Sequence, residues 1–280
     1  MKKGINIWSF PADLPLAKCF ALARDAGFEG VELGLTEDGE VALNSSESQL
    51  LSVKESAAAE GIELYSVATG LYWDNWLTSD SESERSRACD IVKRHLSVAK
   101  TLGCESILVV PGSVNAEFAA PGKVVDYLDA YERSLDAFME LREYAEQADV
   151  SIGIENVWNK FLTSPIELRD FIDKINSPCV GSYLDVGNIL ANGYPEHWIK
   201  ILGNRIKKVH FKDYRIAAGG LHGFVDLLAG DVNYPAVMDA LKSVGYDGWV
   251  SAEMIPNYRY HTEAIIYNTS LSMDKILGRR

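Results

Sequence analysis

Short apolar runs alternate with longer amphipathic stretches along the whole chain. Apolar runs of about four to eight residues are typical of buried strands, whereas apolar residues spaced about three or four apart are typical of helices. The pattern predicts strands at 4–8, 30–35, 63–67, 106–110, 151–156, 180–185, 206–211 and 249–253. It predicts helices at 15–26, 46–60, 82–102, 124–148, 165–175, 196–202, 234–244 and 260–277.

Several of the predicted helix ends carry a local signal. Glycines follow four of these helices, at a position where the left-handed cap conformation costs glycine little: Gly27, Gly61, Gly103 and Gly245. Ser164 and Pro165 combine an N-cap residue with a proline at the first helical position. Strict alternation of strands and helices predicts a parallel sheet with helical crossovers.

The size of the repeating unit selects among parallel-sheet folds. Eight strand–helix units in 280 residues give 35 residues per unit, which fits an eight-stranded βα barrel. A doubly wound open sheet is the alternative, but such a sheet normally has a glycine-rich phosphate turn after its first strand, where this chain has Trp8–Pro11. No linker rich in Pro, Gly or Ser divides the chain. We therefore predict an α/β protein in which residues 1–280 form a single (β/α)8 TIM barrel domain.

Charge and composition narrow the classes of partner. The chain has 27 basic and 40 acidic residues and a formal charge of −13, which disfavours nucleic acid and anionic membranes as partners. No apolar run approaches the roughly 18 residues of a membrane span, and the N-terminus leads directly into a strand without a signal-peptide pattern. The four cysteines form no Cys-x-x-Cys pair. We expect a cytoplasmic protein with structural thiols.

Acidic and imidazole side chains end four consecutive predicted strands: Glu155, Asp185, His210 and Glu253. Active sites of βα barrels form at the carboxyl ends of the strands, so these side chains are expected to lie along one arc of the same rim. Carboxylates held together without a partner repel one another and resist burial, and a divalent cation resolves this conflict. Oxygen-rich ligation with one imidazole suits Mn²⁺, Mg²⁺ or Co²⁺.

Three segments, 153–156, 183–188 and 209–213, resemble the xylose-isomerase-like superfamily of sugar isomerases and epimerases. The resemblance covers essentially the whole chain and is to the ketose 3-epimerases and the L-xylulose-5-phosphate (L-ribulose-5-phosphate) 3-epimerases in particular. It implies one divalent ion held by Glu155, Asp185, His210 and Glu253, with Mn²⁺ expected and Mg²⁺, Co²⁺ or Zn²⁺ as alternatives. It also implies that the two glutamates act as an acid–base pair on opposite faces of the sugar's third carbon.

The chemistry that the resemblance implies is physically coherent. Removal of a proton alpha to a carbonyl gives a cis-enediolate, whose negative charge needs a Lewis acid, and epimerisation needs a second group to protonate the other face. We therefore predict a divalent-metal-dependent epimerase or isomerase acting on a ketose or ketose phosphate. An aldose–ketose isomerase or an inosose-type dehydratase of the same superfamily is the alternative. A non-catalytic sugar-binding barrel is disfavoured because both glutamates are present.

Two departures from the ketose 3-epimerase pattern bear on the substrate. Asn188 stands where those enzymes typically have a substrate-contacting histidine, and Leu162 stands where they have a glutamate. This difference shifts the expected substrate toward a phosphorylated or otherwise different sugar. Lys212 and Arg215 follow His210 on the catalytic side and are candidates for phosphate or hydroxyl contacts.

Two long loops, 68–81 and 212–233, are expected to cover a small ligand. Trp8 is a candidate for an apolar wall against a sugar face, and Asn188 is a further candidate substrate contact. The predicted partner is a small-molecule sugar or sugar phosphate, with no nucleic acid and no membrane. Whether the chain forms a homo-oligomer stays open.

Overall fold

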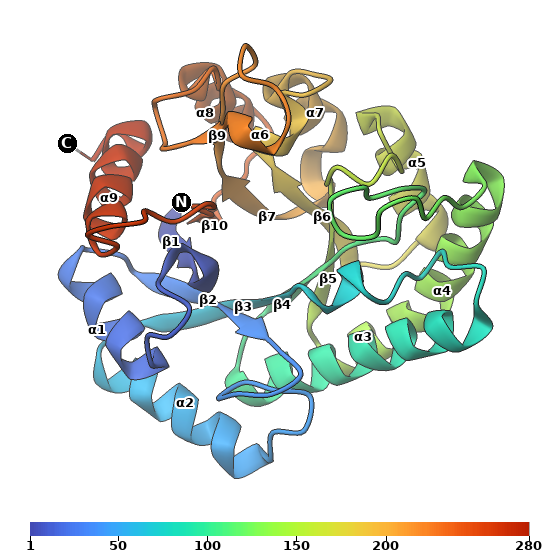
Figure 1. The fold of residues 1–280 in the computed structure, drawn as a ribbon, viewed down its shortest axis with the longest axis horizontal. Coiled ribbons are helices and arrows are strands. Elements are labelled where there is room, and N and C mark those ends of the chain that lie inside the picture. Colours follow the sequence, from blue (N-terminus) through green and yellow to red (C-terminus); the bar gives the residue numbers. More distant parts are fainter. Residues whose placement is uncertain (280) are drawn as a thin grey trace.

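A computed structural model describes residues 1–279 and shows a closed barrel of parallel strands surrounded by helices (Figure 1). The barrel strands are β1 (Lys2–Asn6), β2 (Gly30–Leu35), β3 (Glu63–Thr69), β4 (Ser106–Val109), β5 (Ser151–Glu155), β6 (Val180–Asp185), β7 (Ile206–Phe211) and β10 (Trp249–Ala252). Neighbouring strands pair in the order β1-β10-β7-β6-β5-β4-β3-β2, and all these pairings are parallel. The predicted (β/α)8 TIM barrel is confirmed.

Helices follow the strands in turn and form the outer ring. They are α1 (Leu16–Asp25), α2 (Glu47–Ala59), α3 (Glu82–Leu102), α4 (Tyr127–Ala148), α5 (Pro165–Ile175), α6 (Val186–Ile189), α7 (Pro195–Leu202), α8 (Tyr234–Ser243) and α9 (Ala264–Leu277). The four glycines expected at helix ends, Gly27, Gly61, Gly103 and Gly245, have φ between 69° and 87°. The Ser164 hydroxyl accepts from the Glu167 amide and caps α5, as the sequence predicts.

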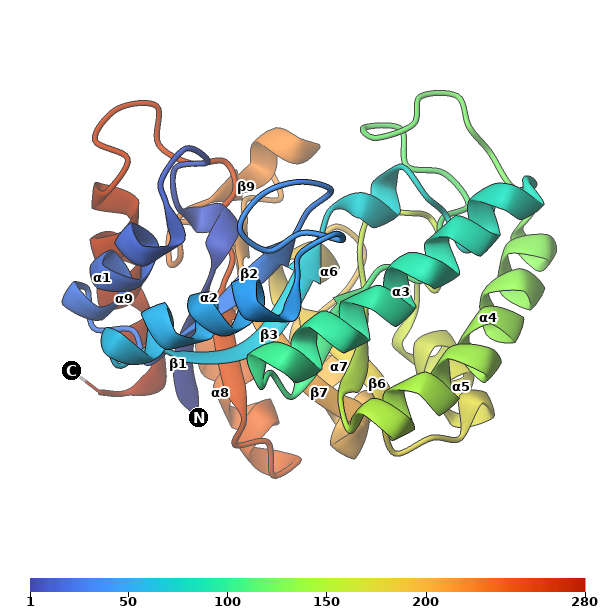
Figure 2. The ribbon, with the colours of Figure 1, turned by 90° about the horizontal axis from the view of Figure 1, so that it is seen from below.

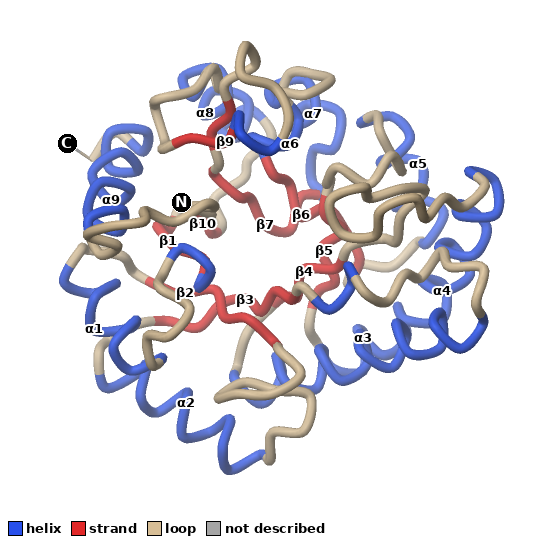
Figure 3. Tube along the Cα trace, viewed as in Figure 1, coloured by secondary structure: helices blue, strands red, loops and turns tan. Residues whose placement is uncertain are grey.

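Short elements interrupt the regular alternation (Figure 3). One-turn 3-10 helices lie at Ile7–Ser9 after β1, Leu71–Trp73 after β3, Gly203–Arg205 before β7 and Leu221–Gly223. The two-residue strands β8 (Asp213–Tyr214) and β9 (Phe224–Val225) pair antiparallel inside the long segment after β7. The first predicted strand, 4–8, was placed two residues too late, because Ile7 and Trp8 already belong to a 3-10 turn.

The two ends of the barrel differ (Figure 2). Both chain termini lie at one end, whereas the long connections between β4 and α4 and between β10 and α9 rise at the other. The second end is the one at which the barrel strands finish, so the long loops surround the carboxyl ends of the strands. Among residues 1–279, no helix has the length and apolar character needed to cross a bilayer.

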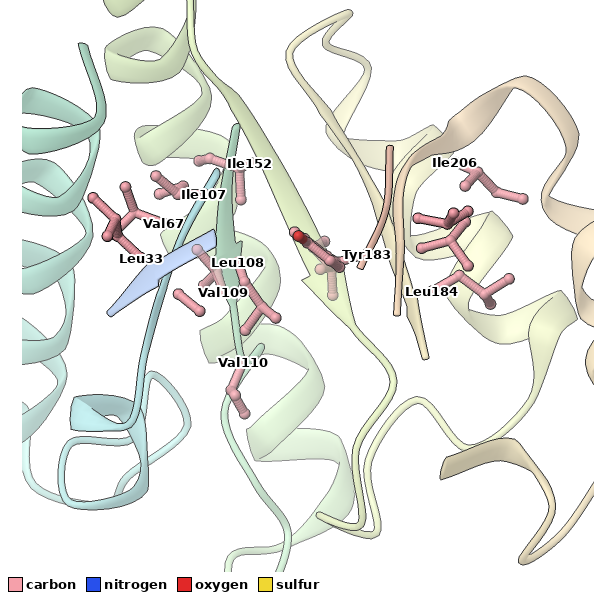
Figure 4. Close-up of a cluster of buried hydrophobic side chains, with 14 of the residues drawn as sticks. Leu33, Val67, Ile107, Leu108, Val109, Val110, Ile152, Tyr183, Leu184 and Ile206 are labelled. Atoms are coloured by element: carbon pink, nitrogen blue, oxygen red, sulfur yellow. The ribbon is translucent and has the colours of Figure 1, made fainter. Parts of the chain in front are cut away.

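The apolar core lies between the barrel and the helices. Leu33, Val67, Ile107 and Ile152 come from four adjacent strands, are fully buried, and group together on the helix-facing side (Figure 4). Burying side chains of this size contributes roughly 1.5–3 kcal/mol each. This outer layer therefore holds the helices against the barrel.

The barrel interior is polar and aromatic instead. The Tyr183 hydroxyl donates to Glu32 Oε2 at 2.6 Å and contacts Ser66 Oγ at 3.3 Å. Tyr65 stacks on Trp249 with ring centroids 4.1 Å apart, and its hydroxyl lies 2.6 Å from Ser251 Oγ. Tyr183, Ser251 and Trp249 thus face inward below the strand ends, in the positions that side-chain alternation predicts.

Candidate metal centre

The four strand-end residues predicted to bind a metal converge at the loop-bearing end of the barrel. One ligand atom from each of Glu155, Asp185, His210 and Glu253 lies within 4.8 Å of all the others. Glu155 and Asp185 end β5 and β6, and Asp185 pairs directly with His210 across the β6–β7 ladder. Glu253 follows β10, and its amide donates to the Phe211 carbonyl at 3.0 Å. Strand register therefore brings all four side chains together.

The geometry of the cluster is that of a cation site. His210 Nδ1 lies 3.6 Å from Glu155 Oε1, 3.9 Å from Glu253 Oε2 and 4.0 Å from Asp185 Oδ2. Within residues 1–279, neither Nδ1 nor Asp185 Oδ2 has a hydrogen-bond partner, although both atoms are buried. A buried polar atom left unpaired costs roughly 1–3 kcal/mol. A divalent cation among these atoms satisfies both, and three carboxylates with one imidazole are a ligand set that such ions accept.

Burial changes the acidity of two of the carboxyl groups. Burial, together with the charge of Glu253, raises the pKa of Glu155 to about 7, even though His210 acts in the opposite direction. Burial likewise raises the pKa of Asp185 to about 6 against the opposing charge of Lys212. A metal ion must therefore displace protons from this cluster near neutral pH.

Lys212 lies beside the cluster and is bound to it. Its Nζ donates to Glu253 Oε2 at 2.6 Å, lies 4.0 Å from Asp185 Oδ2, and sits 4.4 Å from the centre of the Phe224 ring. Burial alone would raise the pKa of Glu253, but the charges of Lys212 and His210, together with the hydrogen bond from Lys212, outweigh burial and lower it. Lys212, predicted as a substrate contact, thus lies at the site. Its ammonium group is bonded to Glu253, one of the candidate metal ligands.

Glu32, which the sequence pattern did not indicate as part of the site, supports His210 from below. His210 Nε2 lies 2.9 Å from Glu32 Oε2, and the Tyr183 hydroxyl donates to the same oxygen. Because a carboxylate accepts, Nε2 is the donor to Glu32, and Nδ1 faces the three other candidate ligands. Partners of this kind orient metal-binding histidines. A charged residue inside the apolar run 30–35 was the available signal.

Two asparagines connect the ends of β5 and β6. Asn156 donates from Nδ2 to the Asp185 carbonyl at 2.9 Å and accepts from the Asp185 amide at 3.0 Å. The Asn188 amide donates to Asp185 Oδ1 at 2.7 Å, and Asn188 Nδ2 donates to the Asn156 carbonyl at 3.1 Å. Asn188, predicted as a substrate contact, therefore holds Asp185 in place and lies beside the cluster.

The other predicted contacts are less directly connected to the cluster. Trp8 is partly buried in the 3-10 turn after β1. Arg215 is exposed and donates to the Ala229 carbonyl at 2.6 Å, so it braces the segment 212–233. In the other long loop, Tyr72 and Trp76 are fully buried, so segment 68–81 packs into the core. Substrate contacts by Trp8 and Arg215 remain predictions.

With fold and cluster described, comparison with known proteins identifies the family. A model of the xylose isomerase-like TIM barrel family matches residues 20–269, and the chain belongs to this family. L-ribulose-5-phosphate 3-epimerase of Salmonella typhi is 24% identical over 262 residues, covering 91% of this chain and 88% of that protein.

Two solved structures show the same fold. D-psicose 3-epimerase from Clostridium cellulolyticum H10, solved with D-tagatose, superposes with a TM-score of 0.81 at 17% identity, over 99% of both chains. The IOLI protein, solved with a zinc atom, superposes with a TM-score of 0.82 at 20% identity, over 100% of this chain and 99% of that one. The chain is thus distantly related to L-ribulose-5-phosphate 3-epimerases and shares the barrel of the ketose 3-epimerases.

Proposed function

We propose that the protein is a divalent-metal-dependent sugar epimerase that inverts the third carbon of a ketose or ketose phosphate. One observation carries the proposal. The buried cluster contains two glutamates whose pKa values are shifted in opposite directions. The pKa of Glu155 is raised to about 7, whereas that of Glu253 is lowered. Epimerisation at a carbon alpha to a carbonyl needs one group that accepts a proton and another that donates one.

In this proposal, Glu155, Asp185, His210 and Glu253 hold the ion. When bound there, a divalent ion supplies Lewis-acid stabilisation of the charge that develops on the substrate oxygens. The unpartnered atoms Asp185 Oδ2 and His210 Nδ1 support this assignment. The sugar 3-epimerases to which the chain is distantly related make the third carbon the natural reacting centre.

The protein's own groups move the protons. Glu253, kept ionised by the ammonium of Lys212 at 2.6 Å, removes the proton from the reacting carbon. Glu155, the other glutamate of the cluster, returns a proton to the opposite face. Both side chains are buried, which keeps bulk water away from the reacting carbon during each transfer, and the proton that Glu155 donates is replaced from solvent between turnovers.

Deuterium labelling tests the reaction. The protein is loaded with Mn²⁺ and incubated in D₂O with L-ribulose, D-fructose or L-ribulose 5-phosphate, and products are read by NMR after the metal is removed. Label at the third carbon, with formation of the epimer, supports the proposal. Label confined to the first or second carbon indicates an aldose–ketose isomerase, and loss of water indicates a dehydratase.

Substitutions of the two glutamates test the acid–base pair. We expect Glu155→Gln and Glu253→Gln each to reduce turnover by at least about 1,000-fold, because each removes both a proton-transfer group and a charged metal ligand. Glu63→Gln, at an exposed position paired with Lys2, is the matched control and should retain activity. Turnover near the unmodified rate in either active-site variant, with circular dichroism unchanged, contradicts the two-base reaction.

A further inference from the structure

A cavity of about 410 Å³ opens beside the metal cluster. Its walls come from residues 115–118, 156–163 and 188–198, with Gly220 and Leu221 closing one side. Asn156 and Asn188 belong to the wall, and the Asn188 amide donates directly to Asp185 Oδ1 at 2.7 Å. Asn156 and Asn188 thus belong both to the cavity wall and to the hydrogen-bonded surroundings of Asp185, so the cavity adjoins the cluster.

The cavity wall is rigid before any ligand binds. Asn159 is fully buried, donates from Nδ2 to the Gly112 carbonyl at 2.7 Å, and accepts from the Val114 amide at 3.0 Å through its own carbonyl. Lys160 and Leu162 lie on either side of Phe161 in the same segment, and both have positive φ, 54° and 49°. Strained conformations of this kind persist where surrounding contacts enforce them, often at ligand sites.

The cavity surface is mostly apolar. The apolar side chains in its wall include Val157, Trp158, Leu162, Ile189, Trp198 and Leu221. The Trp158 ring is fixed by Tyr214 and Phe224, with centroids 5.3 and 5.0 Å away, and its Nε1 donates to the Asn188 carbonyl at 2.9 Å. Indole faces held in this way suit the apolar face of a sugar ring.

The polar groups in the wall are largely committed to the protein. Asn115 Nδ2 contacts Glu117 Oε2 at 3.2 Å, and Asn192 Nδ2 donates to the Thr163 carbonyl at 3.2 Å. Among the cavity residues that the structure describes, Lys160 is the single cation. Hydrogen bonds from Gly122 and Asn115, with a smaller effect of the charge of Lys160, lower the pKa of Glu117, so the wall also carries an anion. A phosphate would find no free cation pair here.

We propose that this cavity is a subsite for an uncharged ring joined to the reacting ketose, such as the second hexose of a keto-disaccharide. The proposal rests on the proposed function for the reacting half of the substrate, and it favours a neutral glycoside over a sugar phosphate. The volume lies within the range of roughly 300–1,000 Å³ typical of small-molecule sites, and the commitment of Lys212 to Glu253 agrees with a neutral substrate.

Binding measurements on the Mg²⁺-loaded protein test the subsite. The probes are D-fructose, D-fructose 6-phosphate, and the two fructose disaccharides lactulose and isomaltulose, with dissociation constants and ring contacts from saturation-transfer NMR. We expect at least one disaccharide to bind about tenfold or more tightly than fructose, with saturation reaching its second hexose. No gain for either disaccharide, or tighter binding of the phosphate ester than of both, overturns the proposal.

Two variants locate the second ring. Ala191 is exposed in the cavity wall, so Ala191→Trp should fill the cavity without disturbing the core and remove the gain of the disaccharide over fructose. Leu162→Gln should reduce the same gain. Leu128→Gln, at an exposed leucine on α4, is the matched control and should leave the ratio within about twofold. A ratio unchanged in Ala191→Trp contradicts the assignment.

The deuterium and binding experiments distinguish failure of the epimerase proposal from failure of the subsite proposal. If no ketose exchanges deuterium at its third carbon, the epimerase proposal fails, while the dissociation constants still report on the cavity. If exchange occurs with simple ketoses and the disaccharides bind no better, the subsite proposal fails alone.

Discussion

Glu32 is a buried carboxylate whose purpose is visible only in three dimensions. It is fully buried in the middle of β2, where an isolated charge is costly, and it is held by His210 and the Tyr183 hydroxyl. By accepting from His210 Nε2, it leaves Nδ1 as the imidazole nitrogen available to a metal ion. The contact with His210 Nε2 therefore explains why the Glu32 carboxylate is buried in the barrel interior.

Replacing Glu32 should weaken metal binding. We expect Glu32→Gln to lower the affinity for Mn²⁺ by about 10- to 100-fold, because His210 loses the carboxylate that orients it. Calorimetric titration of the metal-free protein measures this change. Glu63→Gln on the neighbouring strand is the control, and its affinity should stay within about twofold. Equal affinity in Glu32→Gln and the unmodified protein would show that Glu32 serves packing alone.

The raised pKa values of Glu155 and Asp185 predict how pH affects the metal-free protein. Folding raises the pKa of Glu155 from 4.5 to about 7, so the folded state binds the proton more tightly than the unfolded state. Below about pH 4 the carboxyl group is protonated in both states, and its raised pKa does not reduce the free energy of unfolding. As pH rises toward about 7, the raised pKa reduces the free energy of unfolding more and more. Glu155→Gln cannot titrate at this position. Between about pH 5 and pH 8, the melting temperature of the unmodified protein should therefore fall relative to that of Glu155→Gln.

The same linkage predicts proton release on metal binding. At about pH 6, binding of Mn²⁺ should release more protons than above about pH 8.5, because Glu155 and Asp185 have already ionised at the higher pH. Titrations in buffers of different ionisation enthalpy measure this number, and Glu155→Gln should release fewer protons. A release that does not depend on pH contradicts the raised pKa values of both carboxyl groups.

At the scale of elements, Asp213 organises the long segment that follows β7. Its carboxylate accepts from the Tyr214, Val232 and Leu228 amides at 2.8, 3.1 and 2.8 Å. A Cβ at Gly230 would lie 2.2 Å from Asp213 Oδ1, so glycine is required there for the chain to close on the carboxylate. One buried side chain thus replaces the hydrogen bonds that a longer sheet would supply to this segment.

We therefore expect Asp213→Ala to loosen residues 213–232 while the barrel stays folded. Losing three hydrogen bonds to a charged acceptor costs on the order of 3 kcal/mol or more locally. Hydrogen exchange read by mass spectrometry should show lost protection in this segment and unchanged protection in β5 and β6. Asp239→Ala, at an exposed position on α8, is the control. Loss of protection throughout the barrel would show that the segment does not open on its own.

At the scale of the whole molecule, the strand–helix pattern predicted every barrel strand to within about two residues. The spacing of apolar residues along the chain determines those strands locally, so the sequence is sufficient to predict them. The convergence of the four strand-end residues was predictable for the same reason, since parallel strands of a barrel all end on one rim. The hairpin of β8 and β9 was missed because its strands have two residues each and depend on Asp213, a tertiary contact.

Side chains that meet across the barrel were harder to predict. Glu32 and Tyr65 lie on strands far in sequence from their partners His210 and Ser251, and only strand register places them together. Lys212 was predicted as a substrate contact from its place after His210, but its bond to Glu253 depends on the neighbouring strand. Pattern therefore located the site, whereas the partners of its charged groups required the packed barrel.

The packing of the barrel interior leaves no room for a side chain at Gly4. A Cβ at Gly4 would lie 2.2 Å from the Tyr65 hydroxyl oxygen and 2.6 Å from its Cζ, so Gly4→Ala must displace a ring that stacks on Trp249 and contacts Ser251. Overpacking of a rigid core costs roughly 1–3 kcal/mol, so guanidinium denaturation should show a loss of about 3 kcal/mol. Gly70→Ala, with no atom within 4 Å of its Cβ and an ordinary φ of −84°, should change stability by less than about 0.5 kcal/mol. Removing the ring in the double variant Gly4→Ala/Tyr65→Leu should recover part of the lost stability. Equal stability of Gly4→Ala and Gly70→Ala would mean that the Tyr65 ring is free to move aside.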